Sequence, residues 1–520
     1  MPSATRSVAI TGLQAHLIQV EVDCGRGLPS FHLVGLPEAA VRESRVRVRS
    51  ALRRLECDVN EHALTINLAP AYLRKSGSAF DLAMAVGILD AVGMLSPKRG
   101  ELSEWVMLGE LSLDGAVRPV RGLLPSLLGV HRAGLSRVIV PRGNAAEASS
   151  IDRLEAYVAD DLASVVAFMA GRAELERASA SDPTDAGPPE PDDVDLAEVR
   201  GQETARRGLE IAAAGDHNLL MVGPPGSGKT MLARRLPTLL PPLTDDEAIE
   251  VTSIHSVAGL LCARDGVVRR RPFRAPHHTV SAAGLMGGGT PPRPGEVSLA
   301  HRGVLFLDEL AEYRRHVIEG LRQPLEDGEV TIARAHARAT FPAQPILCAA
   351  VNPCPCGFFG VDRDRCQCRR DAIQQYRSRL SGPLLDRIDL HVHLPPVRIA
   401  ELRGPAEAGE SSAAVRERVV RARTIQRDRF VRGATRHPSN SQLRMDELEA
   451  IADLSRPAHR LLERAADHFG LSARSYGKLR RVARTIADLA ASDAVRETHV
   501  AEALTLRQAS SSIPRRAART

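Results

Sequence analysis

The sequence predicts an α/β protein with a mixed α/β N-terminal domain, a second domain built on a parallel sheet, and a helical C-terminal domain. Three observations lead to this organisation. Strand-like and helix-like stretches alternate over residues 1–172, and a stretch rich in Pro, Asp and Ser follows them. Beyond it, short apolar strands end in glycine or polar residues before a helix begins. A chain of 520 residues is also too long for a single hydrophobic core.

The N-terminal domain is expected to occupy residues 1–172. Its expected strands cover 17–22, 64–68 and 137–140, and its expected helices cover 38–55, 80–94 and 123–133. Residues 173–195 carry many acidic residues and prolines with little apolar surface to bury. They are therefore expected to form a flexible acidic linker.

The rest of the chain divides into three parts. Residues 196–398 show strand–loop–helix signals, residues 399–510 are helical and rich in arginine, and residues 511–520 are expected to fray as a tail. Residues 401–520 hold more Lys and Arg than Asp and Glu. This surplus suits an anionic partner, although solvated helix faces explain it equally well.

The composition excludes several protein classes. The chain is 43% hydrophobic and 25% charged, which is ordinary for a globular protein. It has no run of about 18 apolar residues, so no membrane partner is expected. The first residues lack a signal-peptide pattern, and eight cysteines are few for this length, so we expect a cytoplasmic protein with reduced thiols.

A glycine-rich turn between an apolar strand and a helix start is the strongest single motif. Its spacing is that of a P-loop, which wraps nucleotide phosphates in backbone N–H groups at a helix N-terminus. Lys229 is expected to reach the β- and γ-phosphates of ATP, and Thr230 to hold Mg²⁺. The expected nucleotide-binding residues are Gly223, Pro224, Pro225, Gly226, Ser227, Gly228, Lys229 and Thr230.

A second buried-type strand, 303–307, ends in two carboxylates. Asp308 is expected to bind the Mg²⁺ that accompanies ATP, and Glu309 to polarise the attacking water. The alternative is a strand that merely ends in surface acids. The position of this strand downstream of the P-loop favours the catalytic interpretation.

Three further residues have the chemistry of an ATPase site. Asn352 follows a third apolar strand and can orient the water, while Arg387 precedes another apolar run and can act as an arginine finger in a neighbouring site. An ordinary surface Arg–Asp pair is the alternative for Arg387. Arg474 follows a plausible N-cap at Ser472 and can contact the γ-phosphate, although the choice between it, Arg481 and Arg484 stays open.

These motifs resemble the YifB/ComM family of AAA+ ATPases, which are related to magnesium chelatase. The resemblance covers nearly the whole chain and includes GPPGSGKT (223–230), FRAPHHTVS (273–281), GEVSLAHRGVLFLDEL (295–310), AVNPCPCG (350–357) and SGPLLDRIDL (381–390). It implies a homo-hexameric ring that hydrolyses ATP and drives branch migration of DNA in natural transformation. It also implies role names: sensor 1 for Asn352, arginine finger for Arg387 and sensor 2 for Arg474.

Two segments are candidates for gripping DNA. In helicases related to magnesium chelatase, an insertion at 270–289 faces the pore of the ring, and here it carries Arg274, His277 and His278. The segment 332–338 reads as a β-hairpin with basic positions, which would contact phosphates without reading sequence. Plain exposed loops are the alternative for both. With 3% aromatic residues, any grip on branched or single-stranded DNA is expected to be electrostatic and salt-sensitive.

Four cysteines follow the third strand as two C-x-C pairs. Grouped thiols in a cytosolic protein suggest a tetrahedral structural Zn²⁺. C-x-C pairs are less usual zinc ligands than C-x-x-C pairs, so a loop of reduced thiols is the alternative. The residues concerned are Cys354, Cys356, Cys366 and Cys368.

The N-terminal domain contains segments, 74–82 and 109–141, that resemble the proteolytic domain of Lon. The resemblance implies a ribosomal S5 domain 2-like fold. It places Ala79 at the position of the nucleophilic Ser and Leu124 at the position of its Lys partner. A Ser–Lys pair needs hydrogen-bond contact, so we expect a non-catalytic domain. The rival is an unusual dyad of Ser78 and Lys75.

Three functions are compatible with these features. A DNA translocase or branch-migration motor fits best. A chelatase subunit that drives Mg²⁺ insertion into a porphyrin with partner proteins is the alternative, and an ATP-dependent protease is disfavoured by Ala79 and Leu124.

Overall fold

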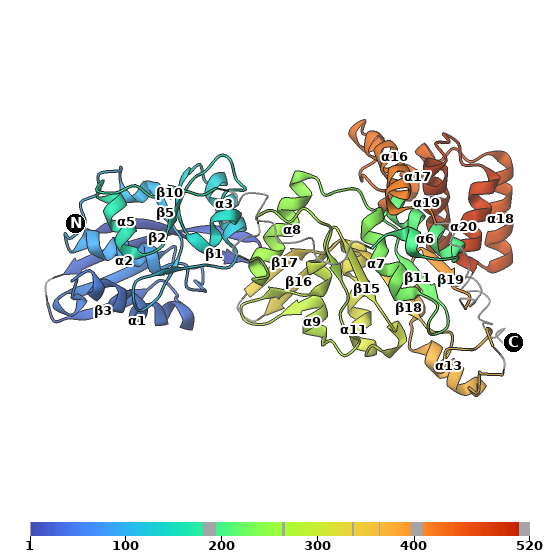
Figure 1. Ribbon diagram of the computed structural model, residues 1–520, viewed down its shortest axis with the longest axis horizontal. Helices are drawn as coiled ribbons and strands as arrows, with labels where there is room; N and C mark the ends of the chain where they lie inside the picture. The colour runs from blue at the N-terminus through green and yellow to red at the C-terminus, as the bar shows by residue number, and fades with distance from the viewer. Residues whose placement is uncertain are drawn as a thin grey trace.

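The computed structural model describes residues 2–25, 27–179, 194–262, 266–334, 337–362, 364–396 and 409–508. The molecule is elongated, with the N-terminal domain at one end and the C-terminal helices at the other (Figure 1). The domain with the parallel sheet lies between them and contacts both of the other domains. The expected tail, 511–520, and most of the expected linker lie outside the described residues.

The N-terminal domain is built on a mixed eight-stranded sheet in the order β10-β9-β8-β5-β1-β2-β4-β3. The strands are β1 (Ser3–Thr11), β2 (Gln14–Gly25), β3 (Ser30–Val34), β4 (Ala63–Ala69), β5 (Trp105–Met107), β8 (Arg137–Pro141), β9 (Glu155–Ala159) and β10 (Glu176–Arg177). A small hairpin joins β6 (Glu110–Leu111) to β7 (Val117–Arg118). The helices are α1 (Ala39–Arg54), α2 (Asp81–Ala91), α3 (Leu123–Arg132), α4 (Ala145–Ala148) and α5 (Leu162–Met169).

Apolar residues on both faces of this sheet are buried. One core gathers β2, β4, α1, α2 and α5, and a second gathers β1, β5, β8 and α3. All six elements predicted here from sequence are present. The start of the linker at residue 173 is wrong, because Glu176 and Arg177 pair with Val158 and Tyr157 of β9. A strand of two residues carries no periodicity that a sequence pattern could reveal.

The second domain is a parallel five-stranded sheet in the order β12-β15-β18-β11-β19, covered by helices on both faces. Its strands are β11 (Leu219–Val222), β12 (Phe273–Arg274), β15 (Val304–Leu307), β18 (Ile346–Val351) and β19 (Leu390–His393). The helices are α6 (Glu203–Gly215), α7 (Lys229–Leu239), α8 (Asp245–Ala258), α9 (Ala282–Met286), α10 (Glu296–Leu299), α11 (Arg315–Glu319), α12 (Pro324–Asp327), α13 (Arg370–Ser378) and α14 (Gly382–Leu385). Two hairpins complete it, β13 (Gly287–Gly288) with β14 (Arg293–Pro294) and β16 (Glu329–Arg334) with β17 (Ala337–Pro342).

The C-terminal domain is helical, as predicted. It consists of α16 (Ser412–Val431), α17 (Met445–Ile451), α18 (Arg456–Phe469), α19 (Ala473–Leu489) and α20 (Glu497–Gln508). Ser411, Ser455 and Ser472 cap the N-termini of α16, α18 and α19 with their side chains. These helices share one core with α6, α7 and one face of the parallel sheet, so the two domains pack as a single unit.

A small contact joins the N-terminal domain to α8 of the second domain. The backbone N–H of Gly122 donates to the carbonyl of Ser256 at 3.1 Å, and the Ser256 hydroxyl donates to the buried carboxylate of Glu147. On the other side, Gly12 in the β1–β2 turn lies against Ala339 of β17. The N-terminal domain therefore contacts the same hairpin that the sequence marks as a DNA candidate.

Candidate active site

The glycine-rich turn forms the cradle that its spacing predicts. It leaves the carboxyl end of β11 at Val222 and enters α7 at Lys229. Gly226 and Gly228 adopt left-handed conformations with φ of +76° and +87°, which glycine tolerates without strain. The Ser227 hydroxyl is buried and finds no hydrogen-bond partner among the described residues. A helix N-terminus with an unpartnered buried hydroxyl fits a bound phosphate group.

Lys229 points into this turn. Its Nζ donates to the carbonyls of Gly223 and Pro224, both at 2.9 Å, and to Oδ1 of Asn352 at 3.1 Å. Burial lowers the pKa of Lys229. Because β18 pairs with β11 in parallel, Asn352 follows its strand at the same sheet edge as the P-loop. The structure therefore brings the P-loop lysine and the expected sensor residue into direct contact.

The expected Mg²⁺ ligands also meet. The Thr230 hydroxyl donates to Oδ2 of Asp308 at 2.7 Å, and Asp308 follows the carboxyl end of β15. A hydroxyl beside a carboxylate matches the oxygen ligands that Mg²⁺ prefers. Glu309 adopts a left-handed φ of +50°, and its backbone N–H donates to Oδ1 of Asp308 at 2.9 Å. Thr230 and Asp308 would hold the Mg²⁺ that accompanies ATP, and Glu309 would not be one of its ligands.

His278 is a residue of this site that sequence reasoning placed elsewhere. Its Nδ1 lies 3.8 Å from Oε2 of Glu309, and its ring stacks near His277 with centroids 4.0 Å apart. The loop is fixed by Tyr313, whose hydroxyl donates to the carbonyl of Pro276 at 2.6 Å. The contact arises because β12 pairs with β15, which leads to Glu309, and a strand of two residues such as β12 gives no signal in the sequence.

Arg274 is held in an ion pair within its own chain. It forms two hydrogen bonds with Glu296, from Nε at 2.6 Å and from Nη2 at 2.9 Å. Within 270–289, Arg274 therefore pairs with Glu296 and His278 lies beside Glu309, while the pore role of this segment stays a prediction.

Arg387 lies at the opposite edge of the sheet. It precedes the amino end of β19, and its carbonyl accepts from the side chain of Asn218, the residue before β11, at 3.2 Å. The P-loop follows the carboxyl end of β11, so the four residues of that strand, roughly 13 Å of chain, separate the two edges. Arg387 and the P-loop of its own chain therefore lie at opposite ends of β11.

Three acceptors hold the Arg387 side chain. Nε donates to the carbonyl of Arg322 at 3.1 Å, and Nη1 donates to the carbonyl of Pro383 at 2.7 Å. Nη2 forms an ion pair with Oε2 of Glu326 at 2.7 Å. The side chain is 9% exposed, so its direction is well defined by packing.

Arg474 joins the same carboxylate. Its Nη2 pairs with Oε1 of Glu326, and its side chain is 52% exposed. The competing arginines of α19 have other partners: Arg481 donates to the carbonyl of Leu443 at 2.6 Å, and the fully buried Arg484 pairs with Asp488. Arg474 thus shares its carboxylate partner with Arg387.

A buried ion pair ties α19 to this edge. Nζ of Lys478 lies 2.8 Å from Oδ1 of Asp389, and both side chains are 8% exposed. Burial alone would raise the pKa of Asp389, but Lys478 and His217 hold the pKa well below its ordinary value. Asp389 is two residues after Arg387, so the helix that carries Arg474 and the segment that carries Arg387 are anchored to each other.

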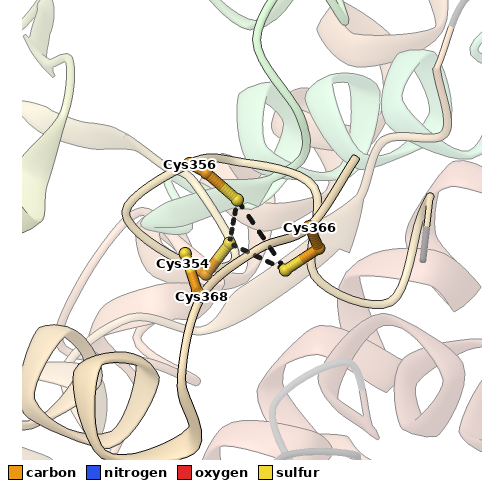
Figure 2. Close-up of side chains that lie close together, drawn as sticks. All are labelled: Cys354, Cys356, Cys366 and Cys368. Atoms are coloured by element: carbon orange, nitrogen blue, oxygen red, sulfur yellow. Dashed lines mark hydrogen bonds between the residues drawn. The ribbon is translucent and has the colours of Figure 1, made fainter. Parts of the chain in front are cut away.

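The four cysteines converge (Figure 2). Sγ of Cys354 lies 3.3 Å from that of Cys356 and 3.9 Å from that of Cys366, and all four Sγ atoms lie within 4.8 Å of one another. Among the described residues, this is the group of His, Cys, Asp or Glu side chains close enough to share a metal ion. Cys368 is the fourth member of the group. Four thiols this close together fit the ligand set of a tetrahedral Zn²⁺.

The cysteine loop touches the nucleotide cradle. Cys354 comes two residues after Asn352, and Gly357 packs so closely on Pro225 of the P-loop that a Cβ there would meet its Cδ at 2.3 Å. Any ion that fixed the loop would therefore also fix one wall of the cradle.

The alternative hypothesis of a Ser78–Lys75 dyad is wrong, because the two side chains bind other partners. Nζ of the buried Lys75 donates to the carbonyls of Gly35, at 2.8 Å, and Pro70. The Ser78 hydroxyl donates to Glu110 instead. The expected substitute for the Lon lysine, Leu124, is fully buried on α3.

The β16–β17 hairpin is present where 332–338 predicted it. Ala333 pairs with Arg338, and both Arg334 and Arg338 are exposed. Residues 335 and 336, which include His336, lie outside the described residues.

Comparison with known proteins decides the family. Family profiles for subunit ChlI of magnesium chelatase match residues 195–402 and 20–144, and a profile for its C-terminal part matches residues 409–507. The competence protein ComM of Haemophilus influenzae is 43% identical over 503 residues, which cover 96% of each chain. The chain belongs to the YifB/ComM family.

Other relatives agree with this assignment. The YifB protein of Escherichia coli is 41% identical over 512 residues, covering 97% of each chain. Lon protease 3 of Sorangium cellulosum is 31% identical over 152 residues, which are 28% of this chain and 18% of that protein. The similarity to Lon therefore covers only part of the chain. The magnesium-chelatase-like ATPase domain, a type of domain that uses ATP and Mg²⁺, is shared with the family.

No helix in the described part of the chain is long and apolar enough to cross a membrane.

Proposed function

We propose that this protein is an ATP-driven motor that assembles into a homo-hexameric ring and moves branched or single-stranded DNA. The observation that carries the proposal is the split of the ATPase residues between two edges of one sheet. Lys229, Thr230 and Asp308 lie at one edge, and Arg387 and Arg474 lie at the other. A complete site then requires two subunits, each giving a different edge.

Each residue has a definite task in such a site. Lys229 and Thr230 bind the phosphates and Mg²⁺, Asp308 supports the metal, and Glu309 takes a proton from the attacking water as Asn352 orients it. Arg387 of the adjacent subunit stabilises charge on the transferring phosphoryl group, and Arg474 contacts the γ-phosphate beside it. His278, next to Glu309, is positioned to orient that carboxylate.

Support for DNA as the substrate comes from the hairpin and from the family. Arg334 and Arg338 are exposed near the tip of β16–β17, where they can contact phosphates of any sequence. One relative is a competence protein, ComM, and the resemblance to this family implies branched DNA as the substrate.

The test is ATP turnover with no DNA, with linear duplex and with forked DNA, each at several salt concentrations. We expect forked DNA to raise turnover and salt to weaken that effect. Lys229→Ala serves as the inactive control, and unwinding or strand exchange on the same forks reports movement. Unchanged turnover on every DNA would count against the motor.

A second candidate is a magnesium-chelatase-like subunit that drives metal insertion with partner proteins, because the matching profiles carry the name of subunit ChlI. The same turnover assay with a tetrapyrrole-binding partner separates the two. Stimulation by that partner and none by DNA would support the chelatase function.

We also propose that the four cysteines hold a structural Zn²⁺ in the cytoplasm, where thiols stay reduced. The ion would be held by Cys354, Cys356, Cys366 and Cys368, and elemental analysis of the purified chain should give one zinc per subunit. Replacing both Cys356 and Cys366 with Ser should remove the zinc and lower the melting temperature. Cys262→Ser, at an exposed cysteine outside the cluster, should change neither.

A metal-free protein whose melting temperature is insensitive to chelators would contradict the zinc site. That result would leave the DNA motor intact, because none of its steps passes through the zinc.

A further inference from the structure

Glu326 has an unusual place in the molecule, because it pairs with both arginines that we assign to the neighbouring ATP site. Oε2 lies 2.7 Å from Nη2 of Arg387, and Oε1 pairs with Nη2 of Arg474. The side chains of Glu326 and Arg474 are 40% and 52% exposed, whereas that of Arg387 is 9% exposed, so another group can reach this cluster from the side of Glu326 and Arg474. The two arginines hold the pKa of Glu326 below its ordinary value although burial alone would raise it, so the carboxylate is ionised at neutral pH.

The chemistry of this contact matches that of a phosphate group. A carboxylate and a γ-phosphate both offer oxygens with negative charge, and guanidinium groups bind either with charge-assisted hydrogen bonds. Arg387 keeps two further hydrogen bonds, to the carbonyls of Arg322 and Pro383, so it stays oriented when its ion pair opens. Glu326 therefore occupies the arginines in the same way as the terminal phosphate of an ATP on the adjacent subunit would.

The position of Glu326 in the chain links this contact to the DNA hairpin. It lies on α12, and that helix ends at Gly328, which has a left-handed φ of +71° and is followed at once by β16. The N–H of Gly328 donates to the carbonyl of Pro324 at 2.9 Å, and the N–H of Ala343 donates to the carbonyl of Gly328 at 2.8 Å. The base of the hairpin is thus bonded directly to the helix that carries Glu326.

We propose that Glu326 is a carboxylate latch: it holds Arg387 and Arg474 until the γ-phosphate on the neighbouring subunit replaces it, and its release frees α12 and the β16–β17 hairpin. The proposal rests on the motor function, and it assigns the step that connects ATP binding to DNA movement. Glu326 acts through the arginines and is a positioning residue.

Glu326→Gln tests the latch, because the amide keeps the shape and loses the charge. The control is Glu329→Gln, which removes an exposed carboxylate three residues away that is paired with neither arginine in the described part of the chain. Without DNA, Glu326→Gln should raise ATP turnover about threefold, the size expected for losing one partly exposed ion pair. Added DNA should then stimulate turnover less than in the wild type.

Amide hydrogen exchange of 329–334 gives a second measurement that a purely structural role would not change in this direction. In the wild type, a non-hydrolysable ATP analogue should speed exchange in this segment. In Glu326→Gln, exchange should be fast without nucleotide, and Glu329→Gln should behave as the wild type does.

The latch would be overturned if Glu326→Gln had the turnover, DNA stimulation and exchange of the wild type. It would also be overturned by turnover as low as that of Arg387→Ala, because Glu326 would then hold the arginines in their active position. A failure of the motor itself looks different: Lys229→Ala and Arg387→Ala would keep full turnover. Inactive Lys229→Ala and Arg387→Ala beside a silent Glu326→Gln would reject the latch alone.

Discussion

The carboxyl ends and the amino ends of the strands form two edges of the five-stranded sheet, and each edge carries groups that the other lacks. The carboxyl edge has a phosphate cradle, a metal-binding pair and a water-activating carboxylate, while the arginines beside it, Arg377 and Arg379, are held by the carbonyl of Pro353 and by Glu312. The amino edge has two arginines paired with a carboxylate, but no glycine-rich turn. Charge on a transferring phosphoryl group needs both sets of groups. The proposed function accounts for this difference, because each subunit of a ring would supply one half of each of two sites.

The largest effect should come from the amino edge. Arg387→Ala should lower ATP turnover by about 1000-fold, because an arginine finger acts on the transition state. Nucleotide affinity should be retained, since the cradle lies at the other edge. Arg379→Ala is the control, because Arg379 is exposed and pairs with Glu312. Arg387→Ala with turnover within twofold of the wild type would break the comparison.

The next effect should come from the carboxyl edge. Glu309→Gln should reduce turnover by about 100-fold, the loss expected on removing a general base. Binding of ATP should persist because Lys229 and Thr230 are untouched, and the protein should accumulate in its ATP-bound assembly. Glu312→Gln, three residues further, should turn over normally. Full activity of Glu309→Gln would show that another group activates the water.

A smaller effect separates the two arginines of the amino edge. Arg474→Ala should reduce turnover by about tenfold, which is the effect of losing one hydrogen bond between charged groups. Its effect should exceed that of Arg460→Ala, an exposed position on α18. If both variants behaved alike, Arg474 would have no part in the ATP site.

The smallest effect is expected from the N-terminal domain, which lies outside the five-stranded sheet. Ser78→Ala should leave ATP turnover and DNA stimulation unchanged, because Ser78 contacts Glu110 and not Lys75. No peptide cleavage should be seen in either the wild type or the variant. Peptidase activity lost on this substitution would revive the protease function.

The sequence predicted well what local chemistry determines. The P-loop, the Asp308–Glu309 pair and Asn352 were found because each follows an apolar strand, and parallel strands bring such ends together. The three helices predicted in the N-terminal domain were found because each spans ten residues or more with apolar positions at helical spacing or, in α2, a continuous apolar run that is buried from Asp81 to Leu89.

What the sequence could not show depends on contacts between distant segments. The pairing of Glu326 with Arg474 joins residues 148 positions apart, and no local pattern contains it. The same holds for His278 beside Glu309, which was assigned to a pore loop. Short strands such as β10 and β12 escaped because two residues have no measurable period.

The most direct test of a site shared between subunits is complementation. Lys229→Ala and Arg387→Ala are purified separately, shown to be inactive, and mixed in equal amounts with ATP and forked DNA. The account predicts that turnover returns in the mixture, because an intact cradle from one variant meets an intact arginine from the other. A mixture as inactive as its parts, under conditions in which the subunits demonstrably exchange, would contradict it.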